Sequence, residues 1–141
     1  MAKKKIIRFE DDFEGILYGL VSQLKDYRLC WYLNKELNFD LMRMNDIEII
    51  HKKKNKTAVF SLYRYEDDLD KCLVYVISNK YQGEHFLPEV RHADFFLVIK
   101  GEVDEQRKLI MRSALKNIPA IQLVIPVEYS GLKSKETLVF E

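Results

Sequence analysis

An almost unbroken apolar run, Ala93-Asp94-Phe95-Phe96-Leu97-Val98-Ile99-Lys100, gives the clearest structural signal in this chain. A strand that is covered on both faces loses the alternation of apolar and polar residues and reads as a continuous run of this kind. The run is too short to span a membrane as a helix, which takes about 20 apolar residues. We therefore predict a central strand over residues 93–100, which Gly101 ends.

The sequence that follows this run predicts one helix and one more strand. Asp104 begins a helix that continues to Lys116, and Pro119 stops it. A last strand is expected over residues 121–125, followed by an extended C-terminal tail from about residue 127. The helix is expected to turn its apolar side chains toward the core, namely Leu109, Ile110, Met111, Ala114 and Leu115.

Upstream of the run, three further strands are predicted, over residues 47–52, 57–65 and 72–78. The first two alternate apolar and polar residues, and the third is rich in Val, Ile and Tyr. Short connections between consecutive strands favour antiparallel pairing. Together with the last two strands, these segments predict a largely antiparallel sheet of about five strands.

The N-terminal part of the chain predicts two helices. Apolar residues recur at steps of three and four between residues 12 and 24, although Gly15 and Gly19 interrupt the pattern. A second helix is expected over residues 27–37, beginning near Asp26. The fold predicted for residues 1–141 is therefore one α+β domain, with two N-terminal helices, the sheet, and one further helix before the last strand.

Composition excludes several classes of protein. The 141 residues are 48% hydrophobic and 32% charged, and 23 Lys+Arg against 22 Asp+Glu leave a formal net charge of +1. These values are unlike those of a disordered chain, a DNA-coating protein or a protein steered to membranes by charge. No signal peptide and no membrane span is evident, and Cys30 and Cys72 both lie in apolar surroundings. We expect free, buried thiols and a cytoplasmic protein.

No motif of catalysis or cofactor binding is found. His85, Glu89, His92 and Asp94 form the one cluster with suitable side chains, but their spacing fits no standard zinc pattern. We therefore expect no metal, no cofactor and no assigned catalytic residue. An enzyme with an unrecognised site near these four residues is kept as an alternative.

A lysine-rich connection provides a second alternative, RNA binding. Its basic residues are Lys52, Lys53, Lys54 and Lys56, and the strand after it contains Phe60, Tyr63 and Tyr65. Lysines beside exposed aromatic rings are typical of sheets that stack bases. The competing interpretation is an edge hairpin that lysines keep soluble and protected from pairing.

The second predicted helix contains the most suggestive group, Arg28, Trp31, Tyr32 and Lys35. Their spacing places a guanidinium, the only tryptophan of the chain and a lysine on one side of the helix. Trp, Tyr and Arg are enriched at the energetic centres of protein interfaces. The competing interpretation is that Trp31 closes the core while the stems of Arg28 and Lys35 cover its edge.

The stretch Leu87-Pro88-Glu89-Val90-Arg91-His92-Ala93-Asp94-Phe95 resembles the signature of the bacterial IPExxxVDY family. Pro88, Glu89 and Asp94 match, whereas Leu87, Ala93 and Phe95 replace Ile, Val and Tyr. Residues 24–31 with Asn34, and residues 132–136, are also similar to family members. The resemblance implies a small cytoplasmic bacterial protein, and it implies no activity.

The leading hypothesis is a non-enzymatic protein-binding or adaptor domain that binds through Arg28, Trp31, Tyr32 and Lys35. Its partner is expected to be another protein, and a homodimer is left open. The family-motif residues Leu87, Pro88, Glu89, Asp94 and Phe95 are expected to shape the fold rather than to act chemically.

Overall fold

The computed structural model describes residues 15–51, 53–68, 71–129 and 132. The strands are β1 (Gly15–Ser22), β2 (Met42–Arg43), β3 (Ile47–His51), β4 (Lys56–Phe60), β5 (Leu62–Asp67), β6 (Cys72–Ser78), β7 (Lys80–Tyr81), β8 (Glu84–His85), β9 (Phe95–Lys100) and β10 (Ile121–Pro126). The helices are α1 (Asp26–Leu37) and α2 (Glu105–Lys116), and a short 3-10 turn, η1, covers Pro88–Val90. The protein therefore has an α+β fold, as predicted.

Six strands form one antiparallel sheet in the order β10-β1-β9-β6-β5-β2. The predicted central strand is β9, which pairs with β1 on one side and with β6 on the other. Its residues Phe95 to Ile99 are all buried. Their side chains alternate between two cores, one on each face of the sheet, which explains why the sequence is apolar throughout.

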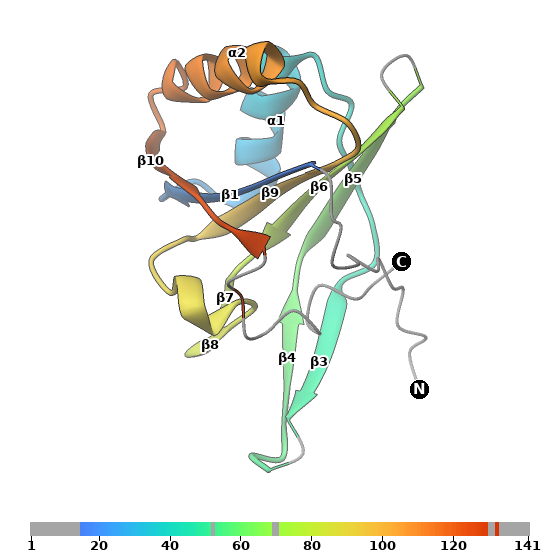
Figure 1. Ribbon diagram of the computed structural model, residues 1–141. Helices are drawn as coiled ribbons and strands as arrows, with labels where there is room; N and C mark the ends of the chain where they lie inside the picture. Colours follow the sequence, from blue (N-terminus) through green and yellow to red (C-terminus); the bar gives the residue numbers. More distant parts are fainter. Residues whose placement is uncertain (1–14, 52, 69–70, 130–131, 133–141) are drawn as a thin grey trace.

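Different elements cover the two faces of the sheet (Figure 1). Helices α1 and α2 lie on one face, where Leu29, Leu33 and Leu115 pack against β1, β6 and β9. The β3-β4 hairpin, the β7-β8 hairpin and η1 lie on the other face, where Phe60, Phe86 and Leu87 are fully buried. We refer to these faces as the helix face and the hairpin face.

The predicted helix over residues 12–24 is wrong, because residues 15–22 form β1. Residues 12–14 lie outside the described residues. β1 is an inner strand whose side chains enter both cores, Tyr18 and Leu20 on the helix face and Leu17 on the hairpin face. Because both faces are buried, apolar and polar residues do not alternate along this strand. Apolar residues then also occur three and four positions apart, the spacing that is typical of a helix. Within the described residues, one helix, not two, precedes the first hairpin.

Two smaller predictions also change. The predicted strand over residues 57–65 is divided at Ser61, where the chain leaves the β3-β4 hairpin as β4 and enters the main sheet as β5. In α2, Met111 and Leu115 are buried as expected, but Leu109 and Ile110 are 67% and 62% exposed. Only a narrow stripe of α2 packs against the sheet, because α1 covers the remaining part of the helix face.

The free thiols agree with prediction. Cys30 and Cys72 are both buried and unbridged. Among the described residues, no helix has the length and apolar character that crossing a membrane requires. The tail begins against the hairpin face, where Leu132 is buried and Tyr129 packs nearby, and residues 133–141 lie outside the described part.

Candidate functional site

Helix α1 is fixed at both ends by residues outside its exposed face. The carboxylate of Asp26 accepts the Tyr27 N–H at 2.8 Å, in the first turn, where a negative charge is favourable. Asn38 ends the helix in the left-handed conformation, with φ of 56°. The side chain of Asn34 accepts the Leu41 N–H at 2.9 Å and thereby orders the chain after the helix.

The side of α1 that faces away from the sheet contains the four residues predicted as a binding group. Leu29, Cys30 and Leu33 are buried. Arg28, Trp31 and Lys35 lie at steps of three and four on the opposite side and are exposed, while Tyr32 is half-buried at the flank. Tyr27 is 60% exposed and adds a second large ring. We call Tyr27, Arg28, Trp31, Tyr32 and Lys35 the outer face of α1.

The indole of Trp31 is exposed but not isolated. Its side chain is 58% exposed, so it does not close the core, contrary to the competing interpretation. The Nζ of Lys35 lies 5.3 Å from its ring centroid, within the range of a cation–π contact. The ring of Tyr32 meets it edge-on, with centroids 5.0 Å apart and an interplanar angle of 85°. Two neighbours therefore limit the freedom of an aromatic ring that faces solvent.

A hollow of about 400 Å³ lies between α1 and α2, beside the C-terminal turn of α1. Glu36 and Asn38 line it from α1, and the exposed Ile110 lines it from α2. Tyr32 precedes Glu36 by one helical turn, so the outer face of α1 continues toward this hollow. The exposed surface of the helix pair thus includes both aromatic and aliphatic side chains.

The family-motif residues surround a buried amide, Asn79. Its Nδ2 donates to the carbonyl oxygens of Val90 and Ala93 at 2.9 and 2.8 Å, and its Oδ1 accepts the Leu87 N–H at 2.9 Å. Pro88 begins η1, the turn that these bonds enclose. A fully buried polar side chain must find partners of this kind, because its unpaired groups would cost free energy. The sequence did not single out Asn79, because its partners lie 8 to 14 residues further along the chain.

Asp94 joins three separate parts of the fold. Its Oδ2 accepts the Ser22 N–H at 2.9 Å, and its Oδ1 pairs with the Lys80 Nζ at 2.8 Å. Its backbone N–H donates to the Leu20 carbonyl at 2.8 Å. The carboxylate thus binds the backbone at the end of β1, where the register between β1 and β10 shifts. Phe95, the next residue, is buried on the helix face.

The remaining members of the proposed catalytic cluster do not form a metal site. Glu89 and His92 are exposed and His85 is half-buried, while Asp94 is held by Ser22 and Lys80. Within the described ranges, no three His, Cys, Asp or Glu side chains are placed to bind a metal ion. The hollow between α1 and α2 is not lined by any of these four residues.

The lysine-rich connection lies at the turn of the β3-β4 hairpin, which projects from the body of the protein (Figure 1). Lys53, Lys54 and Lys56 are exposed, and Lys54 pairs with Glu84 at 3.3 Å; Lys52 lies outside the described residues. Phe60 and Tyr63 are buried in the two cores. Tyr65 is half-buried, so none of the three rings predicted beside the lysines is exposed for base stacking.

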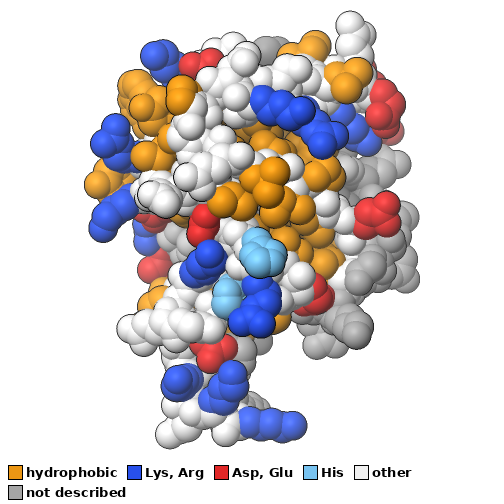
Figure 2. Space-filling model, turned by 90° about the vertical axis from the view of Figure 1, so that its left-hand side faces the viewer, with side chains coloured by type: hydrophobic (Ala, Val, Ile, Leu, Met, Phe, Trp, Pro, Cys, Tyr) orange, Lys and Arg blue, Asp and Glu red, His pale blue; other side chains and the backbone are white. Residues whose placement is uncertain are grey.

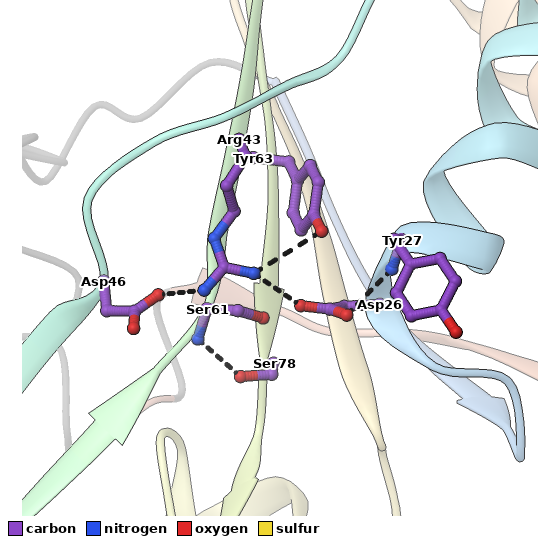
Figure 3. Close-up of polar contacts among 7 residues, drawn as sticks. All are labelled: Asp26, Tyr27, Arg43, Asp46, Ser61, Tyr63 and Ser78. Carbon is purple, nitrogen blue, oxygen red and sulfur yellow. Dashed lines mark hydrogen bonds and ion pairs between the residues drawn. The ribbon is translucent and has the colours of Figure 1, made fainter.

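Arg43, which the sequence did not single out, joins four segments of the chain (Figure 3). Its Nη1 lies 2.9 Å from the Asp26 carboxylate and its Nη2 pairs with Asp46. Its guanidinium lies 5.4 Å from the ring centroid of Tyr63.

These contacts change the pKa values of both residues. The hydrogen bond to the Tyr63 hydroxyl is the largest cause that raises the pKa of Arg43. The largest cause that raises the pKa of Tyr63 is its burial. In the sequence, the one sign of these ion pairs is Asp46, which lies three residues after Arg43.

A second hollow of about 390 Å³ lies beside Arg43, lined also by Lys25, Ser61, Ser78 and Tyr81. The positive charges of Lys25 and Arg43 in this lining are equal in number to the negative charges of Asp26 and Asp46. The Ser78 hydroxyl accepts the Ser61 N–H at 2.8 Å, so it serves the backbone where β4 passes into β5. No histidine is among the residues that line this hollow, so they include no serine–histidine pair.

Comparison with known proteins adds no assignment, since the chain matches no family model and no curated protein or solved structure is significantly similar to it.

Proposed function

We propose that this protein is a protein-binding or adaptor domain and that the outer face of α1 contacts its partner. The observation that supports this most is the exposure of Trp31, the only tryptophan of the chain, on a face that also presents Arg28 and Lys35. Large rings and guanidinium groups provide much of the binding energy of protein interfaces. An indole that only filled the core would be buried.

The contacts around Trp31 favour binding for a second reason. Ordering a flexible side chain at an interface costs about 0.5–1.5 kcal/mol. Lys35 and Tyr32 already restrict the indole, so part of this cost is met before a partner arrives. The outer face is therefore partly preorganised.

The charge of the outer face indicates the chemistry of the partner. Arg28 and Lys35 are exposed cations on either side of Trp31, and Lys25 precedes the helix. A partner surface with carboxylates beside an apolar recess would complement them. We propose an acidic protein surface with room for one indole ring.

The first experiment is a pull-down from the cytoplasm of the cell that makes the protein. Wild type is compared with an Arg28→Ala/Trp31→Ala/Lys35→Ala variant, and each sample is divided and treated with or without nuclease. A Met42→Ala/Ile50→Ala variant, which changes exposed apolar residues elsewhere, is the matched control. A stoichiometric protein that is lost only with the α1 variant supports the proposal, and material lost only with nuclease would indicate RNA instead.

With the partner in hand, single substitutions measure the role of Trp31. Trp31→Ala is expected to cost at least about 2 kcal/mol of binding free energy, about a 30-fold rise in Kd, with little change in unfolding. Titration calorimetry gives the Kd, and the fluorescence of the single tryptophan should shift to shorter wavelength on binding. An unchanged Kd in the folded variant contradicts the assignment.

A further inference from the structure

The two edges of the main sheet differ in how they are protected from pairing. At one edge, β2 has only two residues. At the other, β10 has six, Ile121-Gln122-Leu123-Val124-Ile125-Pro126, and none is charged. Natural proteins usually protect an edge by making it short, charged or covered, because its free backbone groups can pair with another strand. β10 is the long, uncharged edge.

The backbone of β10 presents a donor and an acceptor outward at Val124. The Val127 N–H donates to the Leu17 carbonyl at 2.9 Å, so Val127 is directed toward β1. Along an antiparallel strand, the backbone N–H and C=O groups of successive residues point alternately toward and away from the neighbouring strand. Counting back from Val127, the pair Leu20–Val124 is therefore a non-hydrogen-bonded pair between two hydrogen-bonded ones. Both backbone groups of Val124 face away from β1. Pro126 faces the same way but offers only its carbonyl, because proline lacks an N–H.

Apolar side chains accompany this outer edge. Leu123 is 54% exposed, and Val124 and Ile125 are half-buried. Figure 2, which shows the side of the molecule where β10 lies, has hydrophobic side chains gathered at its centre below a group of Lys and Arg. Within the described part of the chain, no strand pairs with the outer edge of β10. A strand added here would meet both free backbone groups and an apolar surface.

We propose that β10 pairs with β10 of a second copy of this chain, antiparallel and about a two-fold axis at Val124. The two Val124 residues then exchange N–H···O=C bonds, and Leu123 lies opposite Ile125 of the second copy. The sheets of the two copies become one continuous antiparallel sheet. This proposal concerns a surface separate from the outer face of α1.

The absence of charge along the strand selects a second copy as the occupant. An uncharged strand meets no like charge when it pairs with itself. About an axis at Val124, Glu128 lies opposite Ala120 of the second copy, within the uncharged segment 117–120, so the strand ends bring no like charges together either. The edge is thus complementary to itself in hydrogen bonding and apolar surface.

Sedimentation velocity over about three decades of protein concentration tests the proposal. Wild type is expected to form dimers as concentration rises, and Leu123→Lys should raise the dimer Kd at least about tenfold because it places a charge at the edge. Leu109→Lys, the same substitution at an exposed leucine of α2, should dimerise like wild type. The Arg28→Ala/Trp31→Ala/Lys35→Ala variant should also dimerise like wild type, which separates this proposal from the proposed function. A wild type that stays monomeric, or equal effects of the two lysine variants, would overturn it.

A covalent trap tests the register without relying on weakened binding. Val124→Cys should form an intermolecular disulfide on oxidation, since residues exchanging both hydrogen bonds have Cα atoms about 5.5 Å apart. The native Cys30 and Cys72 are buried and should not compete. Leu109→Cys is the control and should remain monomeric on a non-reducing gel. Equal cross-linking of the two variants, or none by Val124→Cys, counts against the pairing.

Discussion

Asn79 shows how one buried side chain can determine the path of a loop. Its amide bonds to Leu87, Val90 and Ala93, and its backbone carbonyl accepts the Phe86 N–H at 2.9 Å. The turn that includes Pro88 is thereby closed against the hairpin face. Leu87 contributes to this loop through its backbone N–H and Pro88 through the turn that it begins, whereas Asp94 acts through its carboxylate.

Asn79→Ala is therefore expected to destabilise the protein strongly. It removes three hydrogen bonds and leaves the Leu87 N–H and the Ala93 carbonyl without this partner, each costing about 1–3 kcal/mol when buried, whereas the Val90 carbonyl keeps its bond from the Ala93 N–H at 3.3 Å. We expect the free energy of unfolding to fall by at least about 3 kcal/mol, measured by urea denaturation. The control is Asn45→Ala, at an exposed site, which should change stability by less than about 0.5 kcal/mol. A small effect of Asn79→Ala would show that the loop closes without the amide.

At the scale of the element, β1 shows why apolar periodicity alone is an ambiguous signal. Its sequence, GILYGLVS, gives apolar residues at both strand and helix steps. As an inner strand it is buried on both faces, and its neighbours in the sheet come from residues 95–100 and 121–126. Pairing with such distant segments cannot be read from a local window.

Gly19→Ala distinguishes the strand from the predicted helix by the sign of its effect. In a helix interior the change would stabilise the protein by about 1 kcal/mol. In β1, an added Cβ would lie 3.0 Å from the Ala93 Cβ, which is attached directly to the backbone and cannot rotate away. We therefore expect a loss of about 1–3 kcal/mol, measured by thermal or urea unfolding. A stabilised variant would contradict the packing of β1 against Ala93.

At the scale of the whole molecule, the sheet separates two cores, and its helix face contains a thiol with an unusual pKa. Burial, and then the nearby charge of Asp26, raises the pKa of Cys30 from 9.0 to about 12. The folded state therefore holds this proton more tightly than the unfolded state does. The stability that results is complete below about pH 9 and is lost as the pH rises toward 12.

Urea unfolding at several values between about pH 8 and pH 11 tests this dependence. The free energy of unfolding of wild type should fall with rising pH. Burial also raises the pKa values of Tyr63 and Tyr75, so part of the fall should remain in Cys30→Ala. The expected result is a lower stability for Cys30→Ala at neutral pH with a shallower alkaline slope. Parallel curves for the two proteins would contradict the role of Cys30.

The local sequence pattern predicted correctly those elements whose structure depends mainly on their own residues. Asp104 accepts the Arg107 N–H at 2.7 Å and caps α2 where the sequence predicted the start of that helix. The helix predicted over residues 27–37 is α1, and the group predicted around Trp31 lies on the side opposite its buried Leu29 and Leu33. That group was found because side chains three and four residues apart on a helix are neighbours in space.

Tertiary structure alone decided the features that depend on contacts between distant segments. Whether Trp31 is buried, which residue Arg43 pairs with, and which amide closes the motif loop all depend on segments that are far apart in the sequence. The sequence by itself determined the α+β class, the central strand and both observed helices, because composition and periodicity report how much of each segment is buried. It left open the order of strands and the exposed edge at β10, because strand pairing joins residues whose separation along the chain leaves no local pattern.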